Sequence, residues 1–136
     1  MRSGLKSCIG FFLLLWTGIV LPGACTCKGG GGMISEMREF DSFFSTHVDS
    51  VATAPRRMRT QVLQRMKAVK DSLVRYNYLS VALKTCLATS DIDSAQLLIR
   101  EIEDFTGRQP FSHRLADLQS ECLNMKGNIY SRKGYI

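Results

Sequence analysis

The chain has 136 residues, of which 45% are apolar and 22% are charged, and its net charge is +6 at neutral pH. This length allows at most one ordinary domain, and so mild a positive charge falls short of the dense basic surface of a typical nucleic-acid binder. The five cysteines are odd in number and irregularly spaced, which argues against a disulfide scaffold. They are Cys8, Cys25, Cys27, Cys86 and Cys122.

The first 24 residues have the three parts of a secretory signal. Two cations precede an apolar run at 8–21, and Pro22-Gly23-Ala24 then supplies a turn and small residues before Cys25. The apolar run of about fourteen residues is shorter than the roughly 18–20 that a membrane-spanning helix needs. We therefore predict a cleaved signal peptide at 1–24, with an uncleaved membrane anchor as the alternative.

The end of this signal, Leu21-Pro22-Gly23-Ala24-Cys25, resembles the lipobox of bacterial lipoproteins. In that family the cysteine is acylated and becomes the first residue after cleavage. Pro22 departs from the branched apolar residue that the family prefers at its position. The resemblance implies that Cys25, or Cys27 as the alternative acceptor, carries lipid. It also implies an exported protein, anchored in the bacterial cell envelope and facing the periplasm.

A glycine run at Gly29–Gly32 separates the cysteines from the rest of the chain. Glycine disfavours helix and has no side chain to bury, so residues 25–32 are predicted to be a lipidated cysteine followed by a tether. A phosphate-binding loop would need a lysine and a hydroxyl after its glycines, whereas Met33-Ile34 follow here. Two spare thiols beside an ordinary cleavage site are the other interpretation. A metal-binding Cys-x-Cys pair lacks further Cys or His at zinc-like spacing.

From residue 33 to 136, apolar residues recur at steps of three or four, which predicts amphipathic helices and an all-α fold. The predicted helices cover Met33–Val51, Arg56–Lys70, Asp71 to Thr89, Ala95 to Phe105 and Phe111 to Tyr130. The apolar face expected of the first helix consists of Ile34, Met37, Phe40, Phe44, Val48 and Val51.

Helix-ending and helix-starting signals separate these segments. Pro55 ends the first segment, and Asp71-Ser72 can cap a fresh helix, although an unbroken helix from Arg56 to Thr89 is the alternative. The connection at Ala88–Asp93 is short, so the two helices of Tyr76–Phe105 are expected to run antiparallel.

The segment Arg56–Lys70 is the most basic part of the chain after the signal. A solvated basic face near anionic lipid is favoured over a DNA-reading helix, because neither interleaved aromatic residues nor a second recognition helix accompanies it. The alternative function is a basic helical protein, nucleic-acid-binding or regulatory, with an uncleaved membrane anchor.

Two segments, 76–107 and 111–136, resemble the tetratricopeptide repeat, a helix–turn–helix unit of 34 residues. In the first segment, the matches are the packing positions of both helices and the acidic-x-Ala start of the second. In the last segment, they are a large apolar residue, a small residue, an aromatic residue and a turn glycine. The matched residues are Leu79, Ala82, Leu83, Cys86, Ala95, Ile99 and Ile102 in the first segment, and Leu123, Gly127, Tyr130 and Gly134 in the second.

The chain departs from the repeat pattern at several positions. Leu83 occupies the small-residue position, Gly107 stands near the place of the usual proline, and Leu79 lies 44 residues before Leu123. The resemblance therefore covers one lengthened repeat and part of another. It implies antiparallel hairpins stacked as a short α-solenoid whose surface binds a protein or peptide partner.

No catalytic constellation can be assembled from the spacing of the residues. His47 and His113 lie on different predicted helices, and Ser112 is expected to cap a helix instead of acting as a nucleophile. We therefore predict a protein that is not an enzyme, with no cofactor, metal or nucleic-acid partner. Cys86 and Cys122 are expected to be buried reduced thiols, with a disulfide as the alternative.

The predicted function is an envelope lipoprotein that presents a protein-interaction scaffold. Bacterial regulators that place such repeats ahead of signalling domains look similar. The chain is therefore also expected to be the sensory N-terminal part of a larger membrane regulator.

Overall fold

The computed structural model describes residues 32–135, in which all regular structure is helical. The predicted all-α class is confirmed for this range. The predictions of a signal peptide at 1–24 and of lipidation at Cys25 or Cys27 lie outside the described residues, as does the tether apart from Gly32, which is helical. By contacts the chain divides into Met1–Ser35 and Glu36–Ile136, and the second unit holds the architecture described below.

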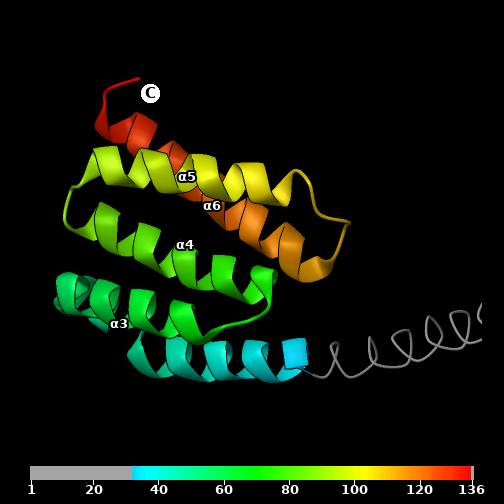
Figure 1. Ribbon diagram of the computed structural model, residues 1–136. Coiled ribbons are helices and arrows are strands. Elements are labelled where there is room, and N and C mark those ends of the chain that lie inside the picture. The colour runs from blue at the N-terminus through cyan, green and yellow to red at the C-terminus, as the bar shows by residue number, and fades with distance from the viewer. Residues whose placement is uncertain (1–31, 136) are drawn as a thin grey trace, which may run out of the picture. The chain divides into compact units, whose positions relative to one another are not determined.

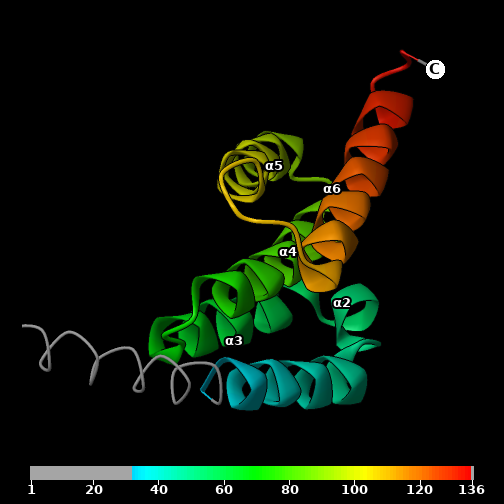
Figure 2. The same cartoon turned by 90° about the vertical axis from the view of Figure 1, so that its right-hand side faces the viewer.

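The first helix covers residues 32–47 of the described range. It is followed by α2 (Ser50–Thr53), α3 (Pro55–Ala68), α4 (Ser72–Ala88), α5 (Ile92–Thr106) and α6 (His113–Arg132). Figure 1 shows that the long helices alternate in direction along the chain, so that α4 and α5 form the predicted antiparallel pair. In the side view of Figure 2, α4 is in the middle. The first helix and α3 lie on one side of it, and α5 and α6 lie on the other.

The prediction of one helix over Met33–Val51 is wrong. The first helix ends at residue 47, a turn follows at 48–49, and α2 is a separate short helix. Val48 is consequently 46% exposed, while Phe43, which the predicted apolar face omitted, is buried. The three-to-four spacing continues across the break, so periodicity by itself could not reveal it.

The start of α4 at Asp71-Ser72 is confirmed, and the unbroken helix from Arg56 to Thr89 is wrong. Val69 and Asp71 have extended backbone, with ψ of 131° and 130°, and the Asp71 side chain accepts a hydrogen bond from the Val74 N–H at 3.0 Å. The Glu36 carboxylate accepts from the backbone N–H groups of Lys70 and Asp71 at 3.0 and 2.8 Å. These two bonds lower the pKa of Glu36.

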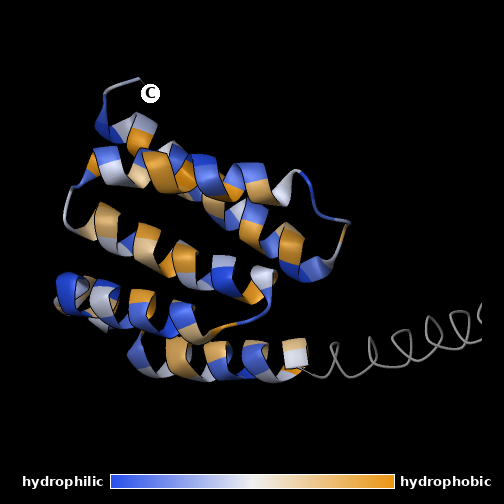
Figure 3. Ribbon diagram, viewed as in Figure 1, coloured by the Kyte–Doolittle hydropathy of each residue, from blue (hydrophilic) through white to orange (hydrophobic). Residues whose placement is uncertain are grey.

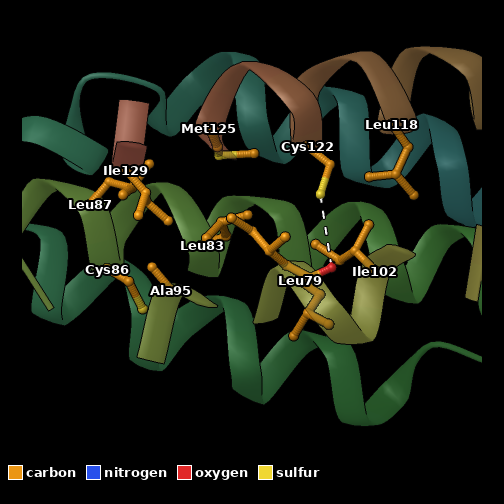
Figure 4. Packing of buried hydrophobic residues seen from close by; sticks show 11 residues of the cluster. Leu79, Leu83, Cys86, Leu87, Ala95, Ile102, Leu118, Cys122, Met125 and Ile129 are labelled. Atoms are coloured by element: carbon orange, nitrogen blue, oxygen red, sulfur yellow. Dashed lines mark hydrogen bonds between the residues drawn. The ribbon is translucent and has the colours of Figure 1, made fainter. Parts of the chain in front are cut away.

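The central feature of the fold is that α4 is buried on two opposite faces. One face contributes to the C-terminal core, which consists of Leu79, Leu83, Cys86 and Leu87 of α4, Ala95, Ile99 and Ile102 of α5, and Leu118, Cys122, Met125 and Ile129 of α6 (Figure 4). The other face contributes to the N-terminal core, which consists of Val74, Tyr78, Val81 and Ala82 of α4, Met37, Phe40 and Phe43 of the first helix, and Met58 and Val62 of α3.

The small polar side chains that are buried on α4 keep hydrogen-bond partners. Asn77, Ser80 and Thr85 donate to carbonyls three or four residues earlier in the same helix, at 2.8, 2.7 and 2.6 Å. Such bonds satisfy the donors locally, so the helix can pass between two apolar cores. Figure 3 shows hydrophobic and hydrophilic residues alternating along the helices.

The first testable prediction concerns the burial of α4. Leu83 is fully buried in the C-terminal core, whereas Leu97 on α5 is 64% exposed. We expect Leu83→Ala to lower the free energy of unfolding by about 2–5 kcal/mol, because it removes apolar contacts and leaves a cavity. Leu97→Ala is the matched control and should change it by less than about 0.5 kcal/mol. Urea titration followed by circular dichroism measures both, and equal effects would contradict the assignment of the core.

Candidate protein-interaction surface

The helices α4 and α6 end in the same backbone motif. At the end of α4, the Asp91 N–H bonds the Cys86 carbonyl at 2.9 Å and the Ser90 N–H bonds the Leu87 carbonyl at 3.2 Å. At the end of α6, the Tyr135 and Gly134 N–H groups bond the carbonyls of Tyr130 and Ser131, both at 3.1 Å. This pair of bonds defines the Schellman motif, whose turning residue has positive φ.

The residues with positive φ confirm that α4 and α6 end in the same motif. Ser90 has a φ of 57° and Gly134 a φ of 78°. Positive φ is strained for a residue with a side chain and free of strain for glycine. At the second site the rings of Tyr130 and Tyr135 meet edge to face, with centroids 6.2 Å apart. The two helix ends are therefore structurally equivalent, and Ser90 and Gly134 are 44 positions apart.

The same offset of 44 relates the buried faces of the two helices. Val74, Tyr78, Val81 and Thr85 of α4 correspond to Leu118, Cys122, Met125 and Ile129 of α6. The α4 residues are buried on the side of the first helix and α3, while the α6 residues are buried against α4 and α5. Each helix thus uses the same face to pack on the pair of helices that precedes it.

The second face of α4 has an exposed counterpart on α6. Leu79, Leu83 and Cys86 are buried in the C-terminal core. Their counterparts at the same offset are Leu123, Gly127 and Tyr130. Leu123 is 63% exposed, Tyr130 is 41% exposed, and a Cβ added to Gly127 would meet no atom within 4 Å. We call the side of α6 formed by Leu123, Gly127 and Tyr130 the open face.

Two hollows border the open face where α6 meets α5. One, of about 280 Å³, is lined by Glu103, Thr106, Gly107, Gln119, Cys122 and Leu123. The other, of about 190 Å³, is lined by Gln96, Ile99, Arg100, Glu103, Lys126, Ile129 and Tyr130. The Glu103 carboxylate and the Lys126 ammonium lie 2.8 Å apart between them, and this contact raises the pKa of Lys126. We call these two hollows, which both include Glu103 in their lining, the groove; its ion pair is partly exposed.

The predicted repeat residues are divided between buried and open positions. Ala95, Ile99 and Ile102 of α5 join Leu79, Leu83 and Cys86 of α4 in the C-terminal core, whereas Ala82 lies in the N-terminal core. In the last segment, Leu123 and Tyr130 are exposed and a Cβ at Gly127 would meet open space, so these matched positions are not covered by other described residues.

Sequence reasoning missed the polar members of the groove. Gln119, Glu103 and Lys126 are ordinary surface residues by type, and only the pairing of α5 with α6 brings them together. A usable signal was present in α6, where Gln119, Ser120, Leu123, Gly127 and Tyr130 form a side of the helix without charge. Surface helices normally carry charges on the side opposite the core.

The serine and the two histidines considered above as catalytic candidates are not brought together by the fold. The Ser112 hydroxyl accepts from the Leu115 N–H at 3.1 Å, so its prediction as the cap of α6 is confirmed. His47 Nδ1 lies 2.8 Å from the Phe43 carbonyl, within its own helix, and His113 is exposed beside Phe111. Within residues 32–135, no group of three or more His, Cys, Asp or Glu side chains could hold a metal ion. No helix in that range is long and apolar enough to cross a membrane.

Cys86 and Cys122 are both buried and both carry free thiols, as predicted. The Cys122 thiol points at the Ile99 carbonyl, with Sγ 4.0 Å from the oxygen (Figure 4). Burial raises the pKa of Cys86 and raises the pKa of Cys122 to about 11. These are the properties of core residues instead of reactive thiols.

We expect these thiols to be protected by the fold. A chain beginning at Gly29 retains Cys86 and Cys122 as its only cysteines. At pH 8 a pKa of about 11 leaves roughly one Cys122 thiol in a thousand ionised. An aromatic disulfide reagent should therefore react slowly with the native chain. In guanidinium, where both thiols are exposed, it should release two equivalents of its coloured thiolate per chain. Since the folded chain keeps its thiol protons to higher pH, the free energy of unfolding should fall as the pH rises from 9 to 11. Rapid native reaction, or no free thiol in guanidinium, would contradict this.

No protein-family model, curated protein or solved structure matches this chain. The function proposed below therefore rests on the residues and contacts of this chain alone.

Proposed function

We propose that this chain is an exported lipoprotein whose helices form a short stack similar to tetratricopeptide repeats and bind a partner protein. The observation that carries the proposal is the open face of α6. Its counterpart on α4 is covered in the C-terminal core, where α5 follows α4 as its antiparallel partner. The element that best fits the open face is therefore a helix that runs antiparallel to α6 and also touches α5.

Gly127 supports a close approach by such a helix. A glycine inside a helix costs about 0.5–1 kcal/mol relative to alanine. Within the described residues, no neighbouring atom forces this position to be glycine, because a Cβ added here would meet open space. A partner helix lying across Gly127, between Leu123 and Tyr130, could bring its backbone close to α6. The small residue is then explained by the partner instead of by the fold.

The composition of the open face defines the chemistry of the partner. Leu123 and Tyr130 supply exposed apolar surface. Glu103 and Lys126 neutralise each other, so the groove lining carries only the single positive charge of Arg100. An amphipathic helix with apolar residues at steps of three or four would bury both side chains, as in other helix-in-groove complexes. Gln119 and Arg100 at the rim can bond its polar side.

A peptide-binding measurement tests the proposal. The probe is a designed amphipathic peptide of about twenty residues, which is long enough for several helical turns. It carries leucine and alanine at steps of three or four, so that they share one side of the helix, and a fluorescent label. We expect its anisotropy to rise when the wild-type chain is added. A peptide of the same composition with scrambled spacing should bind at least about tenfold more weakly, because it cannot present one apolar face.

Gly127→Leu and Asn124→Leu form a matched pair of variants for this assay. Both add one leucine to an exposed side of α6, but only Gly127 lies on the open face. Close helix packing predicts weaker peptide binding for Gly127→Leu, whereas general hydrophobic adhesion predicts stronger binding. The proposal fails if Gly127→Leu binds as tightly as Asn124→Leu, or if the scrambled peptide binds equally well.

Metabolic labelling tests the lipoprotein half of the proposal. Bacteria expressing the full chain are fed a clickable fatty acid, and the wild type is compared with Cys25→Ser and Cys27→Ser. We expect label on the wild type and on Cys27→Ser, with loss in Cys25→Ser, because only a cysteine thiol at the cleavage site of a lipobox is acylated. Label retained in Cys25→Ser and lost in Cys27→Ser would move the acceptor to Cys27. Label retained when both substitutions are combined in one chain would exclude lipidation at these sites.

A further inference from the structure

The segment 55–70, which includes α3, contains six cations and no carboxylate. Two of the cations are engaged within the fold. Arg59 bonds the hydroxyls of Thr85 and Thr89 at 3.1 and 2.9 Å and lies 3.5 Å from the Asp91 carboxylate. The Arg65 guanidinium lies over the Phe43 ring, 4.3 Å from its centroid.

The remaining four cations are exposed. They are Arg56, Arg57, Lys67 and Lys70. The inner side of α3 is occupied by Met58 and Val62, which are fully buried, and helical spacing places Arg56 and Lys67 on the opposite side. Arg57 lies on the flank of the helix, and Lys70 follows its end at Ala68. Figure 3 shows hydrophilic colours along much of this helix. No carboxylate lies within the segment, and Glu36 of the first helix, which accepts from the Lys70 N–H, offsets only the charge of Lys70.

An apolar side chain lies among these cations. Leu63 is 38% exposed, and it is spaced seven residues from Arg56 and four from Lys67. These spacings place the three residues on one side of a helix. Cations around an exposed leucine are typical of a surface that meets the head groups of an anionic membrane, because the charges attract the lipid and the apolar group enters the interface.

We propose that the outer face of α3, formed by Arg56, Leu63 and Lys67, binds anionic phospholipid head groups, with Arg57 at its flank and Lys70 just beyond the helix as additional cations. A lipid surface fits it better than a nucleic acid. The face has an exposed leucine where single-stranded nucleic acids need aromatic stacking partners, and α3 is covered on its other side by α4 and the first helix, as a membrane-facing helix can be. The proposal concerns only the helical unit and does not depend on acylation of Cys25.

Vesicle sedimentation tests the proposal. Both cores lie between Met37 and Ile129, so a chain beginning at Gly29 keeps their contacts and lacks the apolar segment that would bind any bilayer. The vesicles are phosphatidylcholine with or without phosphatidylglycerol. We expect binding only when phosphatidylglycerol is present, and weaker binding at higher salt, because screening shortens the reach of surface charges.

Two pairs of variants separate this face from total charge. Arg56→Glu with Lys67→Glu should lower the partition constant at least about 20-fold, since each cation near an anionic surface contributes roughly fivefold. Arg100→Glu with Lys133→Glu changes the net charge equally, at exposed positions on α5 and after α6, and should lower it far less. Leu63→Ala should weaken binding a few-fold, whereas Leu97→Ala should not.

Three results would overturn the proposal. The first is equal binding to vesicles with and without phosphatidylglycerol. The second is equal loss for the two charge-reversal pairs, which would show that only net charge matters. The third is tighter binding to a single-stranded oligonucleotide than to the vesicles, with displacement of the chain from them, which would make nucleic acid the ligand of this face.

Discussion

The burial of α4 on two opposite faces is the constraint on which the rest of this structure depends. A helix with two apolar faces needs partners on both sides, and here the first helix and α3 cover one face while α5 and α6 cover the other. Few positions of α4 remain for charge. One of them is Lys84, which lies 4.6 Å above the Phe44 ring and pairs with Glu121 of α6. A single side chain of α4 therefore touches the elements on both sides.

Polar contacts fix the two ends of α4. At its start, Glu36 of the first helix accepts the backbone N–H groups of Lys70 and Asp71. Near its end, Arg132 of α6 donates to the Leu87 carbonyl at 2.6 Å, and Arg59 of α3 reaches the turn beyond it. Cations at a helix C-terminus are favoured by the exposed carbonyls and by the helix dipole. Apolar burial thus holds the middle of α4, and side chains from its neighbours hold its ends.

Two surfaces follow from this arrangement, and they lie on different helices. The open face of α6 is uncharged, and its counterpart on α4 is the face that α5 covers. The outer face of α3 is cationic with one exposed leucine. Because the two surfaces share no residue, substitutions in one should leave the other intact, and partner binding can be separated experimentally from lipid binding. The two proposals together describe an adaptor that binds lipid through one helix and a partner protein through another.

Much of the secondary structure could be predicted from the residues alone. Local chemistry determines it at Asp71 and Ser112, whose side chains cap α4 and α6, and at the Ala88–Asp93 connection between α4 and α5. The break after residue 47 escaped prediction because Val48 and Val51 continue the apolar spacing through it. Phe43 was omitted from the predicted apolar face, because two adjacent phenylalanines leave it ambiguous which of them faces the core.

The sequence by itself determined where helices form, how several of them begin and end, and which of their sides are apolar. Only the tertiary structure decided which apolar sides are covered. Leu83 and Gly127 occupy equivalent positions, as do Cys86 and Tyr130, yet the α4 residues are buried and the α6 residues face outward. The physical reason is that helical periodicity depends on residues within one helix, whereas burial depends on whether a neighbouring helix is present to exclude water.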